Sequence, residues 1–262
     1  MVQPQGTLKI KRKNTINRRP GFNLPSVIGH RGAAGIAPEN TLAAIRAAAE
    51  CGVKWVEFDV KLASDGVAIV LHDDDLERTT NGQGPVQGQS LSDLKALDAG
   101  NWFRPRFQGE QVPSLKEALD LLGVLELGAN LELKPGPGRE SETAKVVAEI
   151  LSSFWPDHLP GPVVSSFSDE ALREMQSAAP QFGRALLSHR LAPDWRKRAR
   201  DLGCNAVHCG WQHLTRTQAM AVISGGYQLR CYTVNNPIVG DRLFSWGVES
   251  IITDHPERFT ID

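Results

Sequence analysis

The sequence lacks the features that would assign it to a membrane or secreted class. None of its apolar runs approaches the roughly 20 residues that a transmembrane helix needs. Its first residues contain no apolar core of a secretory signal. The four cysteines form no C-x-x-C pair, and each lies in or beside an apolar segment, so we expect free thiols. These absences predict a cytoplasmic protein without stable membrane association.

Acidic residues are missing from residues 1–25. This segment carries six positive charges, on Lys9, Lys11, Arg12, Lys13, Arg18 and Arg19. Because the whole chain has a net charge of −1, these charges leave −7 on the remainder. A basic segment on an acidic body can contact nucleic acid or a membrane surface, but such a segment is more often a solvated terminus. We therefore predict a disordered tail and no nucleic-acid partner.

Strand-like and helix-like segments alternate along residues 26–262. Strands are expected at 26–30, 54–60, 67–71, 129–134, 162–166, 182–188, 205–209, 227–233 and 249–253, and helices at 39–51, 114–122, 140–154, 169–179, 193–202, 215–224 and 237–246. Counting the strands that precede or follow a helix gives eight β/α units in about 230 residues, which is the size of a closed (β/α)₈ barrel, the TIM barrel of the α/β class. We predict a single domain of this fold.

Residues 74–112 interrupt the alternation and are too long for an ordinary connection, so we predict a small insertion after the second strand. An open, doubly wound sheet is the alternative fold. Such a sheet usually has a glycine-rich phosphate loop after its first strand. The sequence has neither G-x-G-x-x-G nor G-x-x-x-x-G-K-[ST] there, and the barrel is therefore favoured.

Three carboxylates close or follow predicted strands. Glu57 and Asp59 are two residues apart and share one strand face, and Glu132 lies in the next strand of the alternation. In a barrel the carboxyl ends of the strands carry the chemistry. Hard oxygen ligands of this kind suit Mg²⁺ or Ca²⁺, whereas the zinc motif H-E-x-x-H is absent. The alternative is that these acids form ordinary ion pairs at the barrel ends.

Two histidines directly follow strands near these acids. His30 and His72 titrate near neutral pH, so the pair can act as general acid and base. Arg31 and Lys134 could bind the oxygens of a phosphate, or could only pair with the carboxylates. His208 is a weaker candidate that also follows a strand. A serine-histidine-aspartate mechanism has little support because the G-x-S-x-G motif is missing.

Taken together, these motifs resemble the glycerophosphodiester phosphodiesterase family, and most closely its cytosolic bacterial form. The resemblance runs in order from about residue 26 to residue 256. It rests on His30-Arg31-Gly32, Pro38-Glu39-Asn40-Thr41, Glu57-Phe58-Asp59-Val60, Asp65-Gly66, His72-Asp73, Arg78-Thr79-Thr80-Asn81-Gly82, Leu131-Glu132-Leu133-Lys134, Ser165-Ser166-Phe167, Tyr232-Thr233-Val234-Asn235 and Thr253-Asp254.

The resemblance implies a TIM barrel that hydrolyses small glycerophosphodiesters, such as glycerophosphocholine or glycerophosphoethanolamine, to glycerol 3-phosphate and an alcohol. It implies a divalent metal, Mg²⁺ or Ca²⁺, on Glu57, Asp59 and Glu132. It further implies general acid and base roles for His30 and His72, phosphate binding by Arg31 and Lys134, and a cyclic phosphate intermediate.

Two aromatic residues complete the predicted site. Tyr232 stands where many relatives carry tryptophan, which leaves substrate preference open, and Trp102 is either a pocket wall or part of the core of the insertion. A phospholipase-type diesterase acting on lipids and a non-catalytic phosphate-metabolite-binding barrel are the alternative functions. The sequence leaves the oligomeric state open, and a homo-oligomer is compatible with it.

Overall fold

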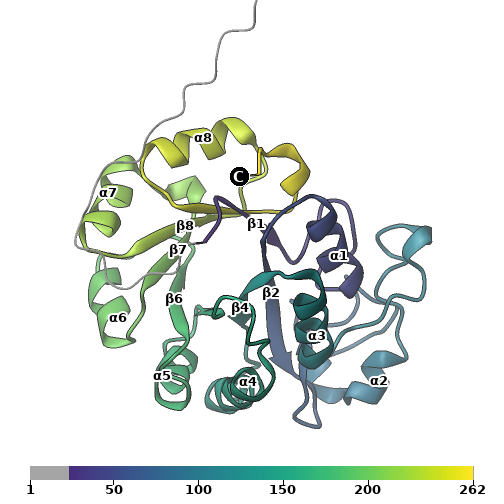
Figure 1. Cartoon of the computed structure of the whole chain (residues 1–262). Coiled ribbons are helices and arrows are strands. Elements are labelled where there is room, and N and C mark those ends of the chain that lie inside the picture. Colours follow the sequence, from purple (N-terminus) through teal and green to yellow (C-terminus); the bar gives the residue numbers. More distant parts are fainter. Residues whose placement is uncertain (1–23, 262) are drawn as a thin grey trace, which may run out of the picture.

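Eight parallel strands form a closed barrel in the computed structural model, which describes residues 24–261 (Figure 1). The barrel strands are β1 (Val27–His30), β2 (Trp55–Leu62), β4 (Gly128–Leu133), β5 (Val163–Ser166), β6 (Gly183–Ser188), β7 (Ala206–Gly210), β8 (Gln228–Tyr232) and β9 (Ser250–Thr253). β1 pairs with both β2 and β9, and these two pairings close the ring. The predicted TIM barrel is confirmed.

Helices follow the strands and cover the outside of the barrel (Figure 1). They are α1 (Leu42–Glu50), α3 (Leu115–Leu125), α4 (Glu140–Phe154), α5 (Asp169–Ala178), α6 (Trp195–Asp201), α7 (Arg216–Ser224) and α8 (Pro237–Ser245). Side-chain caps account for several helix starts. Ser114 and Glu117 form the capping box of α3, because each side chain accepts a hydrogen bond from the other residue's backbone N–H. Every described helix is too short or too polar to pass through a lipid bilayer.

The second barrel strand is longer than its sequence pattern predicts. β2 continues to Leu62 because β3 (Ala68–Val70) pairs with it in antiparallel fashion across the turn at Gly66. The insertion follows β3 and contains α2 (Leu91–Lys95) and two 3₁₀ turns. It has an apolar cluster of its own, which includes Leu76, Leu94 and Val112. Figure 1 shows the insertion beside α1 and α3, on the outside of the barrel.

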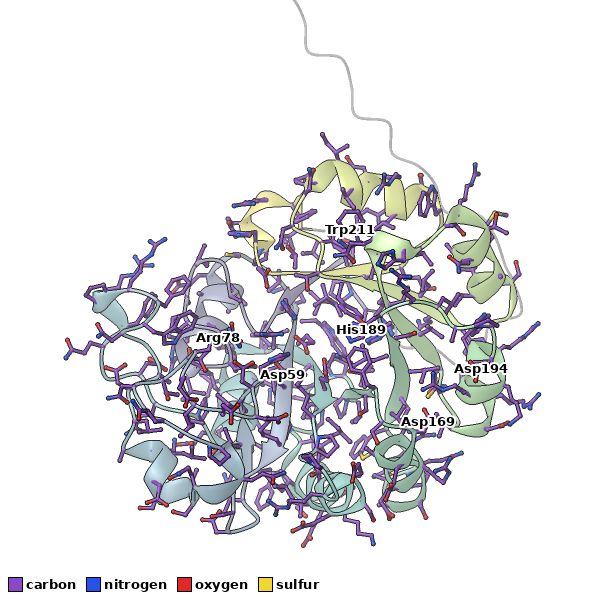
Figure 2. All side chains as sticks on the ribbon, turned by 180° about the vertical axis from the view of Figure 1, so that it is seen from behind. Asp59, Arg78, Asp169, His189, Asp194 and Trp211 are labelled. Atoms are coloured by element: carbon purple, nitrogen blue, oxygen red, sulfur yellow. The ribbon has the colours of Figure 1, made fainter. Side chains whose placement is uncertain are left out.

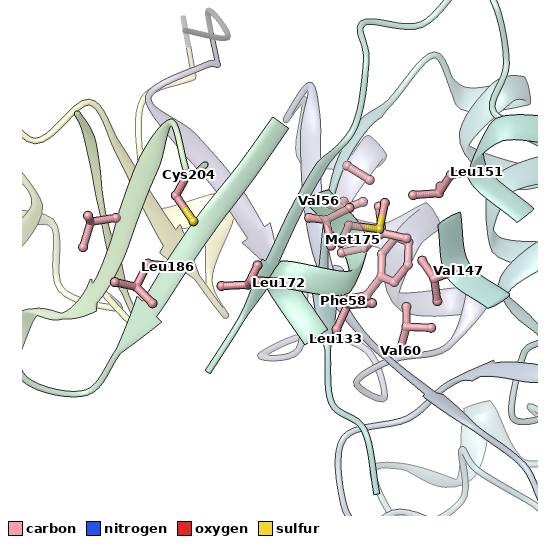
Figure 3. Packing of buried hydrophobic residues seen from close by; sticks show 14 of the residues in the cluster. Val56, Phe58, Val60, Leu133, Val147, Leu151, Leu172, Met175, Leu186 and Cys204 are labelled. Carbon is pink, nitrogen blue, oxygen red and sulfur yellow. The ribbon is translucent and has the colours of Figure 1, made fainter. Parts of the chain in front are cut away.

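Apolar side chains pack in two layers, one outside the barrel wall and one inside it. Phe58 of β2 points outward, and Figure 3 shows it in one cluster with Val147 of α4 and Met175 of α5. Burying one such side chain contributes about 1.5–3 kcal/mol. The alternate residues of each strand point inward, where Trp55 and Ile28 belong to a smaller interior cluster. This alternation directs Glu57 and Asp59 into the barrel.

The single-domain organisation from residue 26 stays a prediction, as does the basic tail. Residues 1–23 of that tail lie outside the described residues.

Candidate active site

The three predicted carboxylates meet inside the mouth of the barrel. Strand register brings them together, since Asp59 of β2 lies opposite Glu132 of β4, and Glu57 lies opposite His30 of β1. One oxygen from each of Glu57, Asp59 and Glu132 lies within 4.8 Å of the other two. Glu57 and Asp59 are almost wholly buried, at 2% and 1% exposure. Three acids at this spacing repel one another strongly unless protons or a cation neutralise them.

Burial and mutual repulsion disfavour the charged form of two of these acids. Burial, followed by repulsion from Asp59, raises the pKa of Glu132 to about 7, although Lys134 and Arg31 oppose the shift. Burial and the neighbouring acids also raise the pKa of Glu57 well above its ordinary value. Oε1 of Glu132 is buried and accepts no hydrogen bond from residues 24–261, although Lys134 Nζ lies 3.5 Å away. A small divalent cation with oxygen preference fits this donor set.

His30 is held at one side of the carboxylates by an aspartate from the last strand. Its Nδ1 donates to Oδ1 of Asp254 at 2.6 Å, and the Nδ2 of Asn235 donates to the other oxygen of Asp254 at 2.7 Å. Burial raises the pKa of Asp254, but the hydrogen bonds from His30 and Asn235 outweigh it and keep the carboxyl ionised. The Nε2 of His30 faces Glu57 Oε2 at 3.8 Å. The ring is therefore oriented with one nitrogen toward the carboxylates.

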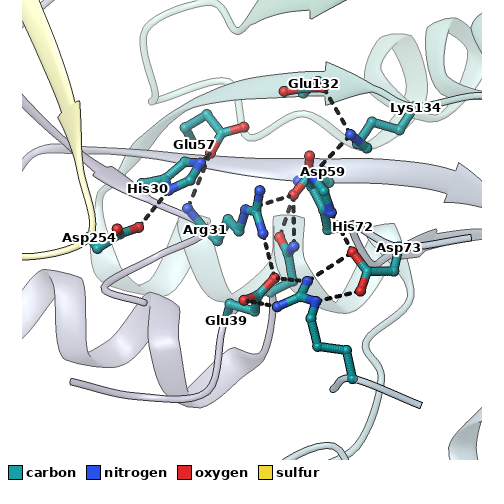
Figure 4. Close-up of polar contacts among 12 residues, drawn as sticks. His30, Arg31, Glu39, Glu57, Asp59, His72, Asp73, Glu132, Lys134 and Asp254 are labelled. Carbon is teal, nitrogen blue, oxygen red and sulfur yellow. Dashed lines mark hydrogen bonds and ion pairs between the residues drawn. The ribbon is translucent and has the colours of Figure 1, made fainter. Parts of the chain in front are cut away.

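His72 is held in a similar way on the other side (Figure 4). Its Nδ1 donates to Oδ1 of Asp73 at 2.6 Å, and Arg78 binds both oxygens of Asp73 at 2.5 and 2.9 Å. Arg78 also binds both oxygens of Glu39, at 2.7 and 2.8 Å. The guanidinium of Arg78 and the imidazole of His72 hold the pKa of Asp73 well below its usual range. Burial lowers the pKa of His72.

Two cationic groups border the carboxylates. The ammonium of Lys134 donates to His72 Nε2 at 3.0 Å, so it lies between that histidine and Glu132. Arg31 pairs with Glu39 at 2.6 Å and with Asp59 at 3.3 Å. The acids around Arg31 raise its pKa against the effect of burial, so it is always charged. Both cations can bind phosphate oxygens near the carboxylates.

The remaining predicted residues lie in different surroundings. Tyr232 lines a small cavity of about 20 Å³ together with His30 and Glu132, and its buried hydroxyl has no hydrogen-bond partner among the described residues. Trp102 is 39% exposed and donates its indole N–H to Ala99 O, and its ring contacts Phe103. These contacts are all within the insertion, and a place for Trp102 in the pocket wall stays a prediction.

The weaker candidate His208 does not face the open part of the barrel. It is fully buried, and Arg230 of the neighbouring strand donates to its Nε2 at 3.1 Å. Burial and the adjacent guanidinium hold the pKa of His208 well below its usual value, so the ring is neutral. Both side chains are fully buried and occupy the barrel interior.

Sequence reasoning assigned no role to the residues that orient the histidines or to a lysine in the same network. Asp254, Asn235, Arg78 and Lys61 belong to this group. Lys61 shares the inward face of β2 and pairs with Asp74 at 2.7 Å. Asp254 follows the last strand directly, so the strand-end rule that selected His30 would also have found it. Arg78 lies in the insertion, and no local pattern marks its partners.

Comparisons with known proteins agree with this geometry. Residues 30–258 match the sequence profile of the glycerophosphoryl diester phosphodiesterase family. A glycerophosphodiester phosphodiesterase of Caldanaerobacter subterraneus is 34% identical over 236 residues, which cover 88% of this chain and 94% of that protein. Another from Bacillus subtilis is 32% identical, covering 88% of this chain and 84% of that protein.

A solved structure is also closely similar. A phosphodiesterase from Oleispira antarctica, in complex with the product sn-glycerol-3-phosphate, superimposes with a TM-score of 0.88. It is 37% identical in sequence, and the match covers 90% of this chain and 95% of that one.

Proposed function

This chain belongs to the glycerophosphoryl diester phosphodiesterase family and is therefore an enzyme of that class, and we propose that it hydrolyses small glycerophosphodiesters to glycerol 3-phosphate and an alcohol. The observation that carries the proposal is the placement of two aspartate-oriented histidines on either side of three clustered carboxylates. Because members of this family are enzymes, the alternative of a non-catalytic phosphate-metabolite-binding barrel is not favoured.

A divalent cation, Mg²⁺ or Ca²⁺, would be held by Glu57, Asp59 and Glu132. When bound, such a cation stabilises negative charge on the phosphoryl oxygens and orients the glycerol hydroxyls. The buried, unpartnered oxygen of Glu132 supports the assignment. Asn40 holds Asp59 in place, since its Nδ2 donates to Asp59 Oδ2 at 2.8 Å and its Oδ1 accepts from Asp59 N at 3.1 Å.

We assign the phosphate position to the space between Arg31 and Lys134. Arg31 is preorganised because Glu39 holds its guanidinium at 2.6 Å, and Arg78 in turn holds Glu39 through two hydrogen bonds. Its backbone N–H also donates to Glu57 Oε2 at 3.1 Å. A cation that is already oriented loses little entropy when it binds a phosphate oxygen.

His72 acts first as the general base in the proposed reaction. Burial favours its neutral form, which can accept a proton, and its Nδ1–H is anchored on Asp73. Nε2 of His72 accepts from Lys134 in the free protein, and this contact is released when the ammonium of Lys134 turns to a phosphate oxygen. The 2-hydroxyl of the glycerol then gives its proton to Nε2 of His72 while its oxygen forms a bond to phosphorus. The bond from phosphorus to the head-group oxygen breaks, and His30 donates a proton to the leaving alcohol.

Water then opens the cyclic glycerol phosphate, with the two histidines in reversed roles. Here His30 removes a proton from water, and His72 returns one to the glycerol oxygen. The attacking hydroxyl is part of the substrate and is already close to phosphorus, which removes most of the entropic cost of bringing a nucleophile. Tyr232 and Asn130 each have a buried oxygen that no described residue hydrogen-bonds, and both line the adjoining cavity, which has room for about one substrate hydroxyl.

The test is the release of glycerol 3-phosphate from glycerophosphocholine and glycerophosphoethanolamine by the purified protein. It is run with EDTA, and again after Mg²⁺ or Ca²⁺ is restored. We expect metal-dependent release and a loss of about 10³-fold or more in His30→Ala and His72→Ala. His158→Ala is the matched control because His158 lies on the surface, and its one hydrogen bond within the described part of the chain is to the carbonyl of Gly123.

Phosphatidylcholine vesicles supply the competing substrate. Hydrolysis of the lipid in place of the small diesters would assign the site to the phospholipase-type reaction. If the folded protein released glycerol 3-phosphate from no diester with either metal, the proposed reaction would be wrong.

A further inference from the structure

A cavity of about 260 Å³ opens beside the carboxylates, at the carboxyl ends of β4 and β5. Glu132 and Lys134 form its inner wall, so it adjoins the proposed phosphate position. Phe167, Glu140 and Asp74 also line it. A group attached to a phosphate held at Lys134 would extend into this space, which is large enough for a small head group.

We propose that this cavity binds the leaving head group and that it selects a cationic ammonium group, such as that of choline, over a neutral alcohol. The inference rests on the proposed reaction and names the substrate class that the site prefers. The proposal depends on the aromatic ring of Phe167 and the carboxylate of Glu140. A quaternary ammonium group has no N–H and cannot donate a hydrogen bond. Such a group is bound through aromatic faces and nearby negative charge.

Phe167 belongs to an aromatic cluster of three rings, which lie at or just after the ends of three barrel strands. The other two members are His189 and Tyr232. The ring of Phe167 stacks on His189, with centroids 4.4 Å apart, and meets Tyr232 edge-on at 6.4 Å. The cluster therefore runs from the small inner cavity at Tyr232 to the rim of the larger one at Phe167. Figure 2 shows His189 toward the middle of the barrel, as it also shows Asp59.

The backbone on both sides of Phe167 is fixed. Ser166 donates its hydroxyl to Leu133 O at 2.8 Å and accepts from the backbone N–H of Ser168 at 3.1 Å. Ser168 in turn caps α5, since its hydroxyl accepts from Ala171 N at 3.1 Å. A ring held in this way is ordered before the ligand arrives, so little conformational entropy is lost on binding.

Glu140 supplies the negative charge. It is half-buried at the first position of α4 and makes no hydrogen bond or ion pair within residues 24–261, whereas Asp74 pairs with Lys61. The position also favours helix formation, because a carboxylate in the first turn interacts well with the helix dipole. Glu142 lies in the same turn, pairs with Arg139 and does not line the cavity. A substitution at Glu142 therefore shows the effect of losing a carboxylate from the first turn of α4 without any effect on a ligand in the cavity.

A second cavity, of about 500 Å³, lies on the other side of Lys134 and fits a cation less well. Carboxylates line it, but Arg78 occupies both oxygens of Asp73 there, and its described lining contains no phenylalanine, tyrosine or tryptophan. Hydroxyl groups, which donate hydrogen bonds, would suit those acids better than a trimethylammonium group.

The experiment compares kcat/KM for glycerophosphocholine with kcat/KM for glycerophosphoglycerol, whose head group is neutral. The wild type should favour the choline substrate. We expect the ratio of the two values to fall about threefold to thirtyfold in Phe167→Leu, the range of a desolvated cation–π contact, and to recover in Phe167→Trp. In Glu140→Gln it should fall about twofold to fivefold, as for a partly exposed charge.

Phe154→Leu and Glu142→Gln are the controls, and both should keep the wild-type ratio. Loss of the stacking on His189 alone would lower stability without changing the ratio. A wild-type ratio of one or less, or an unchanged ratio in Phe167→Leu, would overturn the head-group assignment while leaving the reaction intact. Release from neither substrate by the wild type would overturn both.

Discussion

Replacing Glu132 by glutamine should stabilise the metal-free protein. The side chain is 13% exposed, and burial beside Asp59 raises its pKa from an ordinary 4.5 to about 7. The native state therefore binds its proton more tightly than the unfolded state does. Between about pH 4.5 and pH 7 the wild type loses stability as pH rises, because the unfolded chain ionises first. Glutamine keeps the shape of the side chain and removes the charge.

The magnitude follows from the difference between the two pKa values. A difference of about 2.5 units at about 1.36 kcal/mol per unit is worth about 3 kcal/mol at pH 8, and almost nothing at pH 4. A gain of that size corresponds to roughly 6–12 °C in melting temperature for a domain of this length. Loss of charge at Glu132 also removes one of the repulsions that, after burial and Asp59, raise the pKa of Glu57.

The assay is urea unfolding of both proteins in EDTA at about pH 4, 6 and 8. The advantage of Glu132→Gln should grow with pH, and added Mg²⁺ or Ca²⁺ should reverse the order by stabilising only the wild type. Glu142→Gln, at an exposed site, controls for the chemistry of the substitution. If Glu132→Gln were no more stable than the wild type at pH 8 without metal, the electrostatic account of the cluster would be refuted.

Two further substitutions test the orientation of His30 and the local stability of the fold. In Asp254→Asn, His30 loses the charge that anchors its Nδ1–H, and we expect kcat to fall about 10²-fold or more with little change in KM. A loss confined to KM in steady-state kinetics would contradict this positioning role. In Ser114→Ala, α3 loses its capping box, and urea unfolding should show a loss of about 1 kcal/mol with kcat unchanged. A change below about 0.3 kcal/mol would mean that water replaces the cap.

Much of the fold could be predicted because its signals are local. The boundaries of α4 match the prediction at both ends, since its apolar stripe begins and ends within one segment. The end of β2 was predicted two residues early. Its last residues, Lys61 and Leu62, pair with Ile69 and Ala68 of β3, so a partner outside the strand sets where the strand ends. Trp102 shows the same limit, because its surroundings depend on how the insertion folds.

The sequence by itself determined which residues point into the barrel and which chemistry they can perform. Alternation along β2 places Glu57 and Asp59 on one face, and barrel topology brings His30 to the same mouth. Only the tertiary structure decided which partners set their charge. Asp254 orients His30 from 224 residues away, and Arg78, which binds Asp73, also binds Glu39 from 39 residues away. Periodicity is a property of neighbouring residues, whereas pKa values and orientation depend on groups that become neighbours only when the barrel closes.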